Sequence, residues 1–184
     1  MRMDNGEGSY RRFLDGDESG FDELVEMYRE PLINFINGFL HNPSESEDVA
    51  EDAFVELIVH PGRYSFRSSL KTYLFSVARN KAVDRVRREK KYYSSPIDEL
   101  DMADTDMVEE CIFSKENGEK VRVALERINP EYSAILRLIY IEGMTSEEAA
   151  AVMKKSKKQI ANLTYRAKQA LKRAMEKGGF SYEK

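Results

Sequence analysis

Cysteine, histidine and tryptophan are scarce or absent in this 184-residue sequence, which has one cysteine, two histidines and no tryptophan. Cys111 alone cannot form an internal disulfide, and no histidine stands near it at the spacing of a metal site. No apolar run approaches the roughly 20 residues of a membrane-spanning helix, and the polar start MRMDNGEGSY lacks the features of a signal peptide. We therefore expect a cytoplasmic protein with no metal site and no membrane span.

The sequence also lacks the groupings that catalysis requires. It has no glycine-rich phosphate-binding loop, and its two histidines, His41 and His60, are far apart. Carboxylates are frequent between residues 45 and 56, but no histidine, lysine or nucleophile accompanies them, so acid–base catalysis is not favoured. We predict that the protein is not an enzyme and that it uses no cofactor and no small-molecule substrate.

Charge is plentiful and strongly segregated along the chain. The 29 Lys and Arg against 33 Asp and Glu give a formal net charge of −4. The net charge is −10 over residues 1–66, +7 over 67–91, −8 over 92–119 and +7 over 120–184. Blocks of this size indicate different partners for different segments, because a uniformly solvated surface mixes charges of both signs.

The first basic block is predicted to be a loop that leads into a helix from Leu70 onward. Apolar residues recur there at helical spacing, and polar residues occupy the opposite face. The apolar stripe contains Leu74, Phe75, Ala78, Ala82 and Val86, and the opposite face carries Asn80, Asp84, Arg87 and Lys91. Aromatic rings beside the positive charge, from Tyr64, Phe66 and Tyr73, suit the stacking of unpaired nucleic-acid bases. The alternative is a core helix whose basic face is only solvated.

Before this block, a polar tail precedes a helix that we expect to start with Ser19 as its N-cap. Pro31 is expected to break or kink the apolar pattern, which then resumes. Ser44 and Glu47 predict a capping box for the next helix, which runs toward Val59. The outward face of that helix carries Glu45, Asp48, Glu51, Asp52 and Glu56. Such a face is either solvated or a docking surface for a basic partner.

Residues 93–114 differ in composition from the segments on either side. They contain Pro96, few large apolar residues, and the acids Asp98, Glu99, Asp101, Asp104, Asp106, Glu109 and Glu110. This composition is typical of a flexible linker, with an inert spacer as the alternative to a binding segment. We therefore predict an all-α protein with two helical domains, over residues 12–92 and 115–177.

The second domain has clear helix start and stop signals. Asn129 with Pro130 predicts an N-cap and a first-turn proline, and Gly143 predicts the end of that helix. Thr145 and Glu148 predict a capping box for the helix that follows. The domain is therefore expected to consist of short helices joined by tight turns.

The last two helices have the pattern of a helix-turn-helix. Residues 154–156 form a short turn before a helix over 157–177, and Ala150 is expected where the two helices cross. Nine Lys and Arg between residues 154 and 177 stand against one acid, Glu176. This charge favours a recognition helix in a DNA major groove over a solvated face.

Three parts of the chain carry a resemblance to a known family. They are FLDGDESGFDELVEMY with SESEDVAEDAFVEL, then SFRSSLKTYLFSVARNKAVDRVRR, and finally INPEYSAILRLIYIEGMTSEEAAAVM with the basic helix that follows. In this order they resemble the extracytoplasmic-function (ECF, group IV) sigma factors of the sigma-70 family, the promoter-recognition subunits of bacterial RNA polymerase. The resemblance covers residues 12–177. It implies a four-helix region 2 over 12–92, a linker like the one the family threads through the RNA-exit path, and a region 4 over 115–177.

The resemblance implies an alternative sigma factor that binds the polymerase core and directs promoter recognition and transcription initiation. Its implied partners are the β′ clamp helices and β flap of the core and promoter DNA, with an anti-sigma factor as a further candidate. The implied core-binding residues are Asp48, Glu51, Asp52 and Glu56. Those implied for melting and reading the −10 element are Tyr64, Phe66, Arg67, Tyr73, Asn80, Asp84, Arg87 and Arg88. Those implied for the −35 element are Lys154, Lys155, Ser156, Lys158, Gln159, Asn162 and Arg166.

The chain departs from the family pattern at several positions. Tyr73 stands where the family usually has tryptophan, and Lys154 stands in the turn where many such motifs have glycine. Leu163 and Thr164 stand where the family commonly has a basic and an apolar residue. A rival hypothesis is a two-domain helix-turn-helix regulator that binds duplex DNA without being a polymerase subunit.

Overall fold

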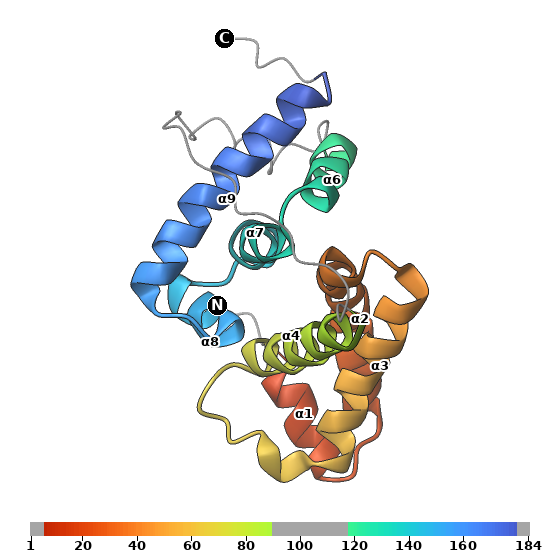
Figure 1. The fold of residues 1–184 in the computed structure, drawn as a ribbon. Coiled ribbons are helices and arrows are strands. Elements are labelled where there is room, and N and C mark those ends of the chain that lie inside the picture. The colour runs from red at the N-terminus through yellow and green to blue at the C-terminus, as the bar shows by residue number, and fades with distance from the viewer. Residues whose placement is uncertain (1–5, 90–117, 180–184) are drawn as a thin grey trace. The chain divides into compact units, whose positions relative to one another are not determined.

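The computed structural model describes residues 6–89 and 118–179, and every regular element in these two ranges is helical. The chain divides into two compact units, unit 1 within residues 1–91 and unit 2 within residues 92–184 (Figure 1). The predicted class, all-α with two helical domains, is confirmed. The predicted acidic linker over 93–114 lies outside the described residues.

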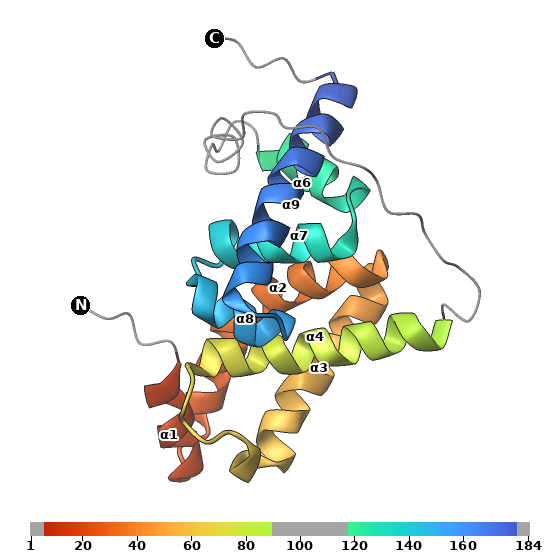
Figure 2. The same ribbon diagram turned by 60° about the vertical axis from the view of Figure 1, so that its left-hand side comes forward.

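Unit 1 is a bundle of α1 (Glu7–Leu14), α2 (Ser19–Leu40), α3 (Pro43–Val59) and α4 (Leu70–Glu89). Helix α2 packs against the other three, and α3 also packs against α4 (Figure 2). The core is filled by side chains with almost no exposed surface, among them Leu24, Leu32, Phe35, Ile36, Leu57, Leu74 and Phe75. Burying each such side chain contributes about 1.5–3 kcal/mol, so this shared core holds the bundle together.

Helix α1 corrects the prediction of a polar tail. Its sequence EGSYRRFL has few apolar residues, but Tyr10 is completely buried, and its hydroxyl donates to the Leu57 carbonyl at 3.0 Å. Gly20 of α2 allows the two backbones to approach, because a Cβ at that position would lie 2.2 Å from the carbonyl oxygen of Ser9. Tyr10, Phe13 and Leu14 stand at helical spacing, but they span little more than one turn, which is too short for periodicity to predict a helix.

The structure corrects the predicted start of α2 and shows what Pro31 does not do. Ser19 is the first helical residue rather than the N-cap, and its backbone N–H donates to Asp17 Oδ1 at 3.1 Å. Pro31 does not break the helix, which continues to Leu40. The carbonyl that loses its partner belongs to Met27, whose side chain is 41% exposed, so water can reach this side of the helix.

The predicted capping box at the start of α3 is also wrong. Asn42 is the N-cap, and its Oδ1 accepts from the Glu45 backbone N–H at 3.3 Å. Pro43 occupies the first helical position, which it favours because that residue has no partner for a backbone N–H. Glu47 forms an ion pair with Arg29 of α2 instead of returning to Ser44.

Unit 2 consists of α6 (Gly118–Arg127), α7 (Pro130–Leu136), α8 (Ser146–Met153) and α9 (Lys157–Lys177). Helix α7 continues into one π-helical turn over Arg137–Ile141, and Gly143 follows with φ of +66°. The predicted N-cap at Asn129 and the capping box of Thr145 and Glu148 are confirmed. Helix α9 packs against α6, α7 and α8. The fully buried alanine of α8 is Ala149 rather than Ala150, which is half-buried.

Candidate protein and nucleic-acid interfaces

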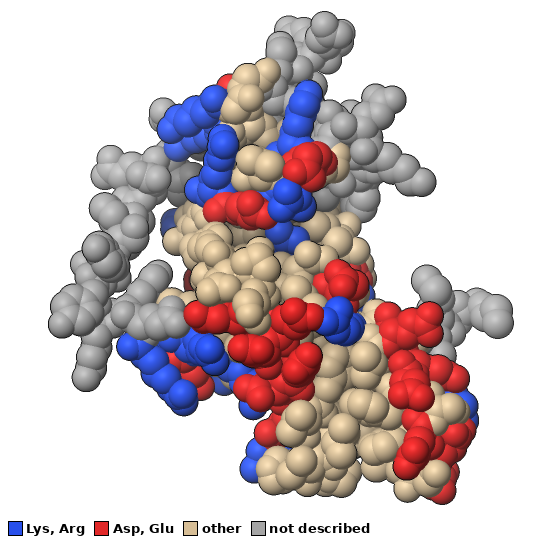
Figure 3. Space-filling view, turned by 90° about the vertical axis from the view of Figure 1, so that its right-hand side faces the viewer, with Lys and Arg blue, Asp and Glu red and all other residues tan. Residues whose placement is uncertain are grey.

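The outward face of α3 combines acidic and apolar side chains. Asp48, Glu51 and Asp52 are exposed, and within the described ranges no ion pair involves them. One to two turns further on, Val55, Ile58 and Val59 are 52%, 40% and 59% exposed. Figure 3 looks onto the side of unit 1 where α3 lies and shows acidic side chains gathered there. We call these six residues the α3 face.

The other three carboxylates of α3 are paired inside unit 1. Glu45 Oε2 lies 3.4 Å from Arg85 Nε of α4, and Glu47 pairs with Arg29 of α2. Glu56 pairs with Arg63, and its side chain is only 18% exposed. Glu56 was expected on the binding surface, but its charge is already matched by an arginine of its own unit. This pairing was not predicted, because Arg63 lies in the loop after the helix, where helical periodicity places no partner.

The loop between α3 and α4, residues 60–69, opens with a 3-10 turn over Pro61–Arg63. Tyr64 is 4% exposed, and its hydroxyl lies 2.8 Å from the Ser68 carbonyl and 3.1 Å from Glu7 Oε1, to one of which it donates. Burial, reinforced by the Glu7 carboxylate, raises the pKa of Tyr64 well above its usual value. The neutral ring therefore supports the loop from inside and does not offer a free face to a base.

Other aromatic and basic side chains of the same region are more accessible. Phe66 and Tyr73 are half-buried, and Arg67 is exposed. The Tyr73 ring lies 5.2 Å from the Tyr64 ring, centroid to centroid, and burial raises the pKa of Tyr73 as well. The structure thus brings together the three aromatic residues predicted from the sequence, with Tyr64 beneath the other two rather than beside them.

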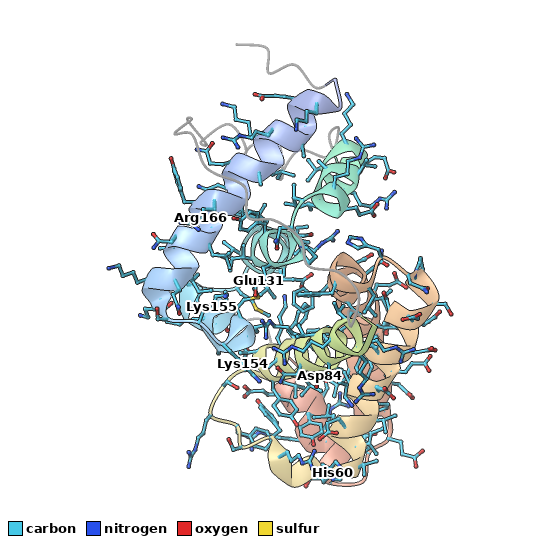
Figure 4. The ribbon with its side chains drawn as sticks, viewed as in Figure 1. His60, Asp84, Glu131, Lys154, Lys155 and Arg166 are labelled. Carbon is cyan, nitrogen blue, oxygen red and sulfur yellow. The ribbon has the colours of Figure 1, made fainter. Side chains whose placement is uncertain are left out.

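Helix α4 has the predicted apolar stripe and a charged outer face. Leu74, Phe75, Ala78 and Ala82 are completely buried, as is Leu70 at its start, whereas Val86 is half-buried. Asp84, labelled in Figure 4, is exposed. Arg87 and Arg88 are also exposed, and Asn80 is half-buried. Arg87 Nη1 lies 3.9 Å from Asp84 Oδ1, a distance at which an exposed pair contributes little. These side chains can therefore exchange their partners for a ligand at small cost.

The turn between α8 and α9 is built by caps at both ends. Lys154 ends α8 in the left-handed conformation, with φ of +53°. Ser156 is the N-cap of α9: its Oγ accepts from the Gln159 N–H at 3.2 Å, while Gln159 Oε1 accepts from the Ser156 N–H at 2.8 Å. Two residues expected to read DNA therefore also shape the helix start, whose backbone N–H groups and dipole favour an anion.

Further along α9, polar and basic side chains point outward. Lys158, Gln159, Asn162 and Arg166 are exposed, whereas Ile160 is buried. Lys155 Nζ lies 3.3 Å from Glu131 Oε2 at the start of α7, and the two are adjacent in Figure 4. Lys157 pairs with Glu147 of α8. Sequence reasoning missed both acids, because each meets its lysine only when the helices of unit 2 pack.

Two segments of the sequence match known family models. Residues 24–92 match Sigma-70 region 2, and residues 118–171 match Sigma-70 region 4. The chain belongs to the sigma-70 family. It is 26% identical to the ECF RNA polymerase sigma factor SigM of Bacillus subtilis, over 85% of this chain and 96% of SigM. It is 22% identical to SigW of the same organism, over 87% of this chain and 91% of SigW.

Two solved structures show the same fold. The structure of CnrH in complex with the cytosolic domain of CnrY superposes with a TM-score of 0.67 at 20% identity, over 95% of this chain and 99% of that one. The sigma factor RpoE of Bartonella quintana, in complex with the anti-sigma factor NepR, superposes with a TM-score of 0.64 at 18% identity, over 85% of this chain and 96% of that one.

This ECF sigma factor binds the RNA polymerase core and promoter DNA, and it directs promoter recognition and transcription initiation. It is an initiation factor rather than an enzyme. The rival hypothesis of a regulator that acts without polymerase is therefore set aside. Among the helices that the structure describes, none is long and apolar enough to cross a membrane.

Proposed function

We propose that three surfaces divide the work of initiation. The α3 face binds the β′ clamp helices of the core, the 60–69 loop with α4 melts and reads the −10 element, and the start of α9 reads the −35 element. The first two surfaces belong to region 2, residues 12–92 together with the whole of α1. The third belongs to region 4, residues 115–177, which also binds the β flap. Residues 93–114 are the linker between the two regions. The protein acts in the cytoplasm, where the polymerase transcribes.

One observation carries the assignment of the α3 face. Asp48, Glu51 and Asp52 are exposed without ion pairs in the described chain, next to Val55, Ile58 and Val59. Carboxylates beside exposed apolar side chains suit an interface whose polar edge surrounds an apolar centre. Glu56, paired with Arg63, contributes to the shape of this surface and is not expected to be a main contact.

For the −10 element, the accessible groups are aromatic and basic. Phe66 and Tyr73 can stack on unpaired bases, and Arg67, Arg87 and Arg88 can hold phosphates. Asn80 and Asp84 are placed to bond base edges from α4. Tyr64 supports these groups from within the unit, because its ring is buried.

For the −35 element, short polar groups and lysines have different roles. Asn162 and the free amide N–H of Gln159 can donate to base edges in the major groove. Lys154, Lys155, Lys158 and Arg166 are suited to phosphates, and Ser156 holds the helix start that faces them. Lys155 exchanges Glu131 for a phosphate when DNA binds.

The two solved relatives also support a regulatory partner. RpoE was crystallised with an anti-sigma factor and CnrH with the cytosolic domain of CnrY. We infer that an anti-sigma factor is a further partner of this chain.

A charge reversal tests the α3 face. Changing Asp48, Glu51 and Asp52 to Lys should weaken binding to purified core polymerase by about 10-fold or more, equivalent to about 1.4 kcal/mol. The reason is that three attractive contacts become repulsive at once. Affinity is measured by titration of labelled protein, and helical circular dichroism checks that the fold is intact.

The matched control places the same charge change on another surface of unit 1. Asp15 at the end of α1 and Asp22 and Glu26 on α2 are exposed. Changing them to Lys should leave core affinity within about two-fold at an ionic strength that screens long-range electrostatics. Equal losses in the two triple variants, or no loss in the first, would remove the α3 face from the proposal.

A further inference from the structure

Helix α1 contacts the 60–69 loop through aromatic and charged side chains. The guanidinium carbon of Arg11 lies 4.3 Å from the centroid of the Phe66 ring. The Tyr10 ring lies 5.8 Å from the Tyr64 ring and 6.2 Å from the Phe66 ring. Glu7 Oε1 lies 3.1 Å from the Tyr64 hydroxyl. A helix that precedes the loop by some fifty residues in sequence therefore surrounds its aromatic centre.

The loop holds Phe66 in a conformation that L residues avoid. Its φ is +56°, in the left-handed region where a Cβ crowds the backbone, and nothing in the local sequence favours it. Such a conformation persists only where the surroundings fix it. Here they are the Tyr64 ring, with centroids 4.5 Å apart, and the Arg11 guanidinium.

The same geometry decides which groups of the loop point outward. Tyr64 is buried and Phe66 is half-buried, whereas Ser65, Arg67 and Ser68 are exposed. If Phe66 turned to a more common φ, the direction of the chain through Arg67 would change with it, because two backbone dihedrals set each step. The contact with Arg11 therefore bears on what the loop presents to a ligand.

We propose that Arg11 is a positioning residue for −10 recognition: by lying over one face of the half-buried Phe66 ring, it holds the 60–69 loop in the shape that reads the melted strand. This rests on the proposed −10 role of the loop. A guanidinium over an aromatic face is attracted by the ring quadrupole, so a neutral side chain of similar length cannot replace it. Arg11 needs no contact with DNA to act in this way.

The test uses the holoenzyme and a promoter identified by run-off transcription on genomic fragments. The promoter DNA is prepared as a fork junction with its non-template −10 strand unpaired. Arg11→Met should weaken binding of this fork by about five-fold, the effect of losing one cation–π contact. Binding to core polymerase should not change, and helical circular dichroism should show that the fold is intact. Arg12→Met is the matched control, because Arg12 is the next residue of α1 but pairs with Asp17 and Glu23, away from the loop.

A double-mutant cycle shows whether Arg11 acts through Phe66. Phe66→Leu removes the aromatic face and should itself weaken binding of the fork, and adding Arg11→Met should then have no further effect. Full additivity of the two changes, or equal losses from Arg11→Met and Arg12→Met, would overturn the positioning role.

Two further outcomes distinguish failure of the Arg11 role from failure of the proposed −10 role of the loop. If Phe66→Leu weakens binding of the fork but Arg11→Met does not, the positioning role fails and the −10 role of the loop stands. If Arg11→Met, Phe66→Leu and Arg67→Ala all bind the fork normally, both fail.

Discussion

At the scale of single residues, Lys154 has a backbone conformation that favours glycine and a side-chain charge that can bind a phosphate. It ends α8 with φ of +53° and ψ of +47°, where glycine is the usual residue because it has no Cβ. The backbone N–H of Lys155 reaches the Ala150 carbonyl at 3.1 Å, so the turn closes α8 even though lysine is strained there. The side chain is exposed beside the start of α9, where a cation can meet a phosphate.

Substituting Lys154 by Gly should separate these two effects. The free energy of unfolding should rise by up to about 1 kcal/mol, because the strain removed exceeds the extra backbone entropy of glycine in the unfolded chain. Affinity of the holoenzyme for promoters should fall, because a phosphate contact is lost. Urea unfolding measures the first effect and fork or duplex titration the second.

Lys154→Ala is the control for this prediction. It removes the same charge but keeps a Cβ at positive φ, so promoter affinity should fall equally while stability should not rise. If the alanine variant is as stable as the glycine variant, the gain in stability does not come from relieving backbone strain at this turn.

At the scale of elements, the contact between α1 and α2 depends on Gly20. A Cβ there would lie 2.2 Å from the Ser9 carbonyl oxygen and 2.9 Å from the Phe13 backbone nitrogen. Both neighbours are backbone atoms, which cannot move without displacing the helix. The close contact at Gly20 and the hydrogen bond from Tyr10 to the Leu57 carbonyl together fix the position of α1 on the bundle.

Changing Gly20 to Ala should therefore destabilise unit 1 by about 3 kcal/mol, at the upper end of the usual cost of overpacking. Gly62→Ala is the matched control, because a Cβ at Gly62 would meet nothing within 4 Å. Its effect should stay within about 0.5 kcal/mol, as for most surface changes. The measurement is the midpoint of thermal unfolding, and similar midpoints for the two variants would contradict the close approach seen between α1 and α2.

At the scale of the whole molecule, the four charge blocks remain the dominant feature. Both basic blocks, each at +7, could bind DNA alone by releasing counterions, whereas the acidic blocks oppose such binding. In unit 2, Lys155 and Lys157 already form ion pairs with Glu131 and Glu147. We expect the free protein to bind promoter DNA poorly and the polymerase to relieve this by engaging the acidic surfaces.

Converting the seven carboxylates of residues 98–110 to their amides should test this expectation. The variant, with Asp98, Glu99, Asp101, Asp104, Asp106, Glu109 and Glu110 changed, should bind a −35 duplex more tightly than the natural chain at low salt. Its advantage should shrink as salt rises, since the Debye length falls to about 8 Å at physiological ionic strength. Equal binding by the two free proteins at every salt concentration would end the charge-masking idea and leave the sigma-factor assignment intact.

The sequence by itself determined many of the features whose signal lies within a few turns of chain, although the caps of α2 and α3 were predicted one or two residues away from their true positions. The apolar stripe of α4, the N-cap at Asn129, the capping box at Thr145 and the span of α9 were all predicted, because periodicity and capping depend on residues three or four apart. The segregation of charge and the order of the family segments also lie in the sequence. They were sufficient to predict a two-domain helical sigma factor.

Only the tertiary structure decided which of the predicted residues are available to a partner. Tyr64 is buried against α1, Glu56 is paired with Arg63, and Lys155 is paired with Glu131. Helix α1 is held on the bundle by the buried Tyr10 and the close approach at Gly20, because eight residues are too few to form a stable helix alone. Burial and ion pairing depend on how the chain folds back on itself: the Glu56–Arg63 pair spans seven residues across a turn, and the Tyr64–Glu7 contact spans 57, so helical periodicity predicts neither.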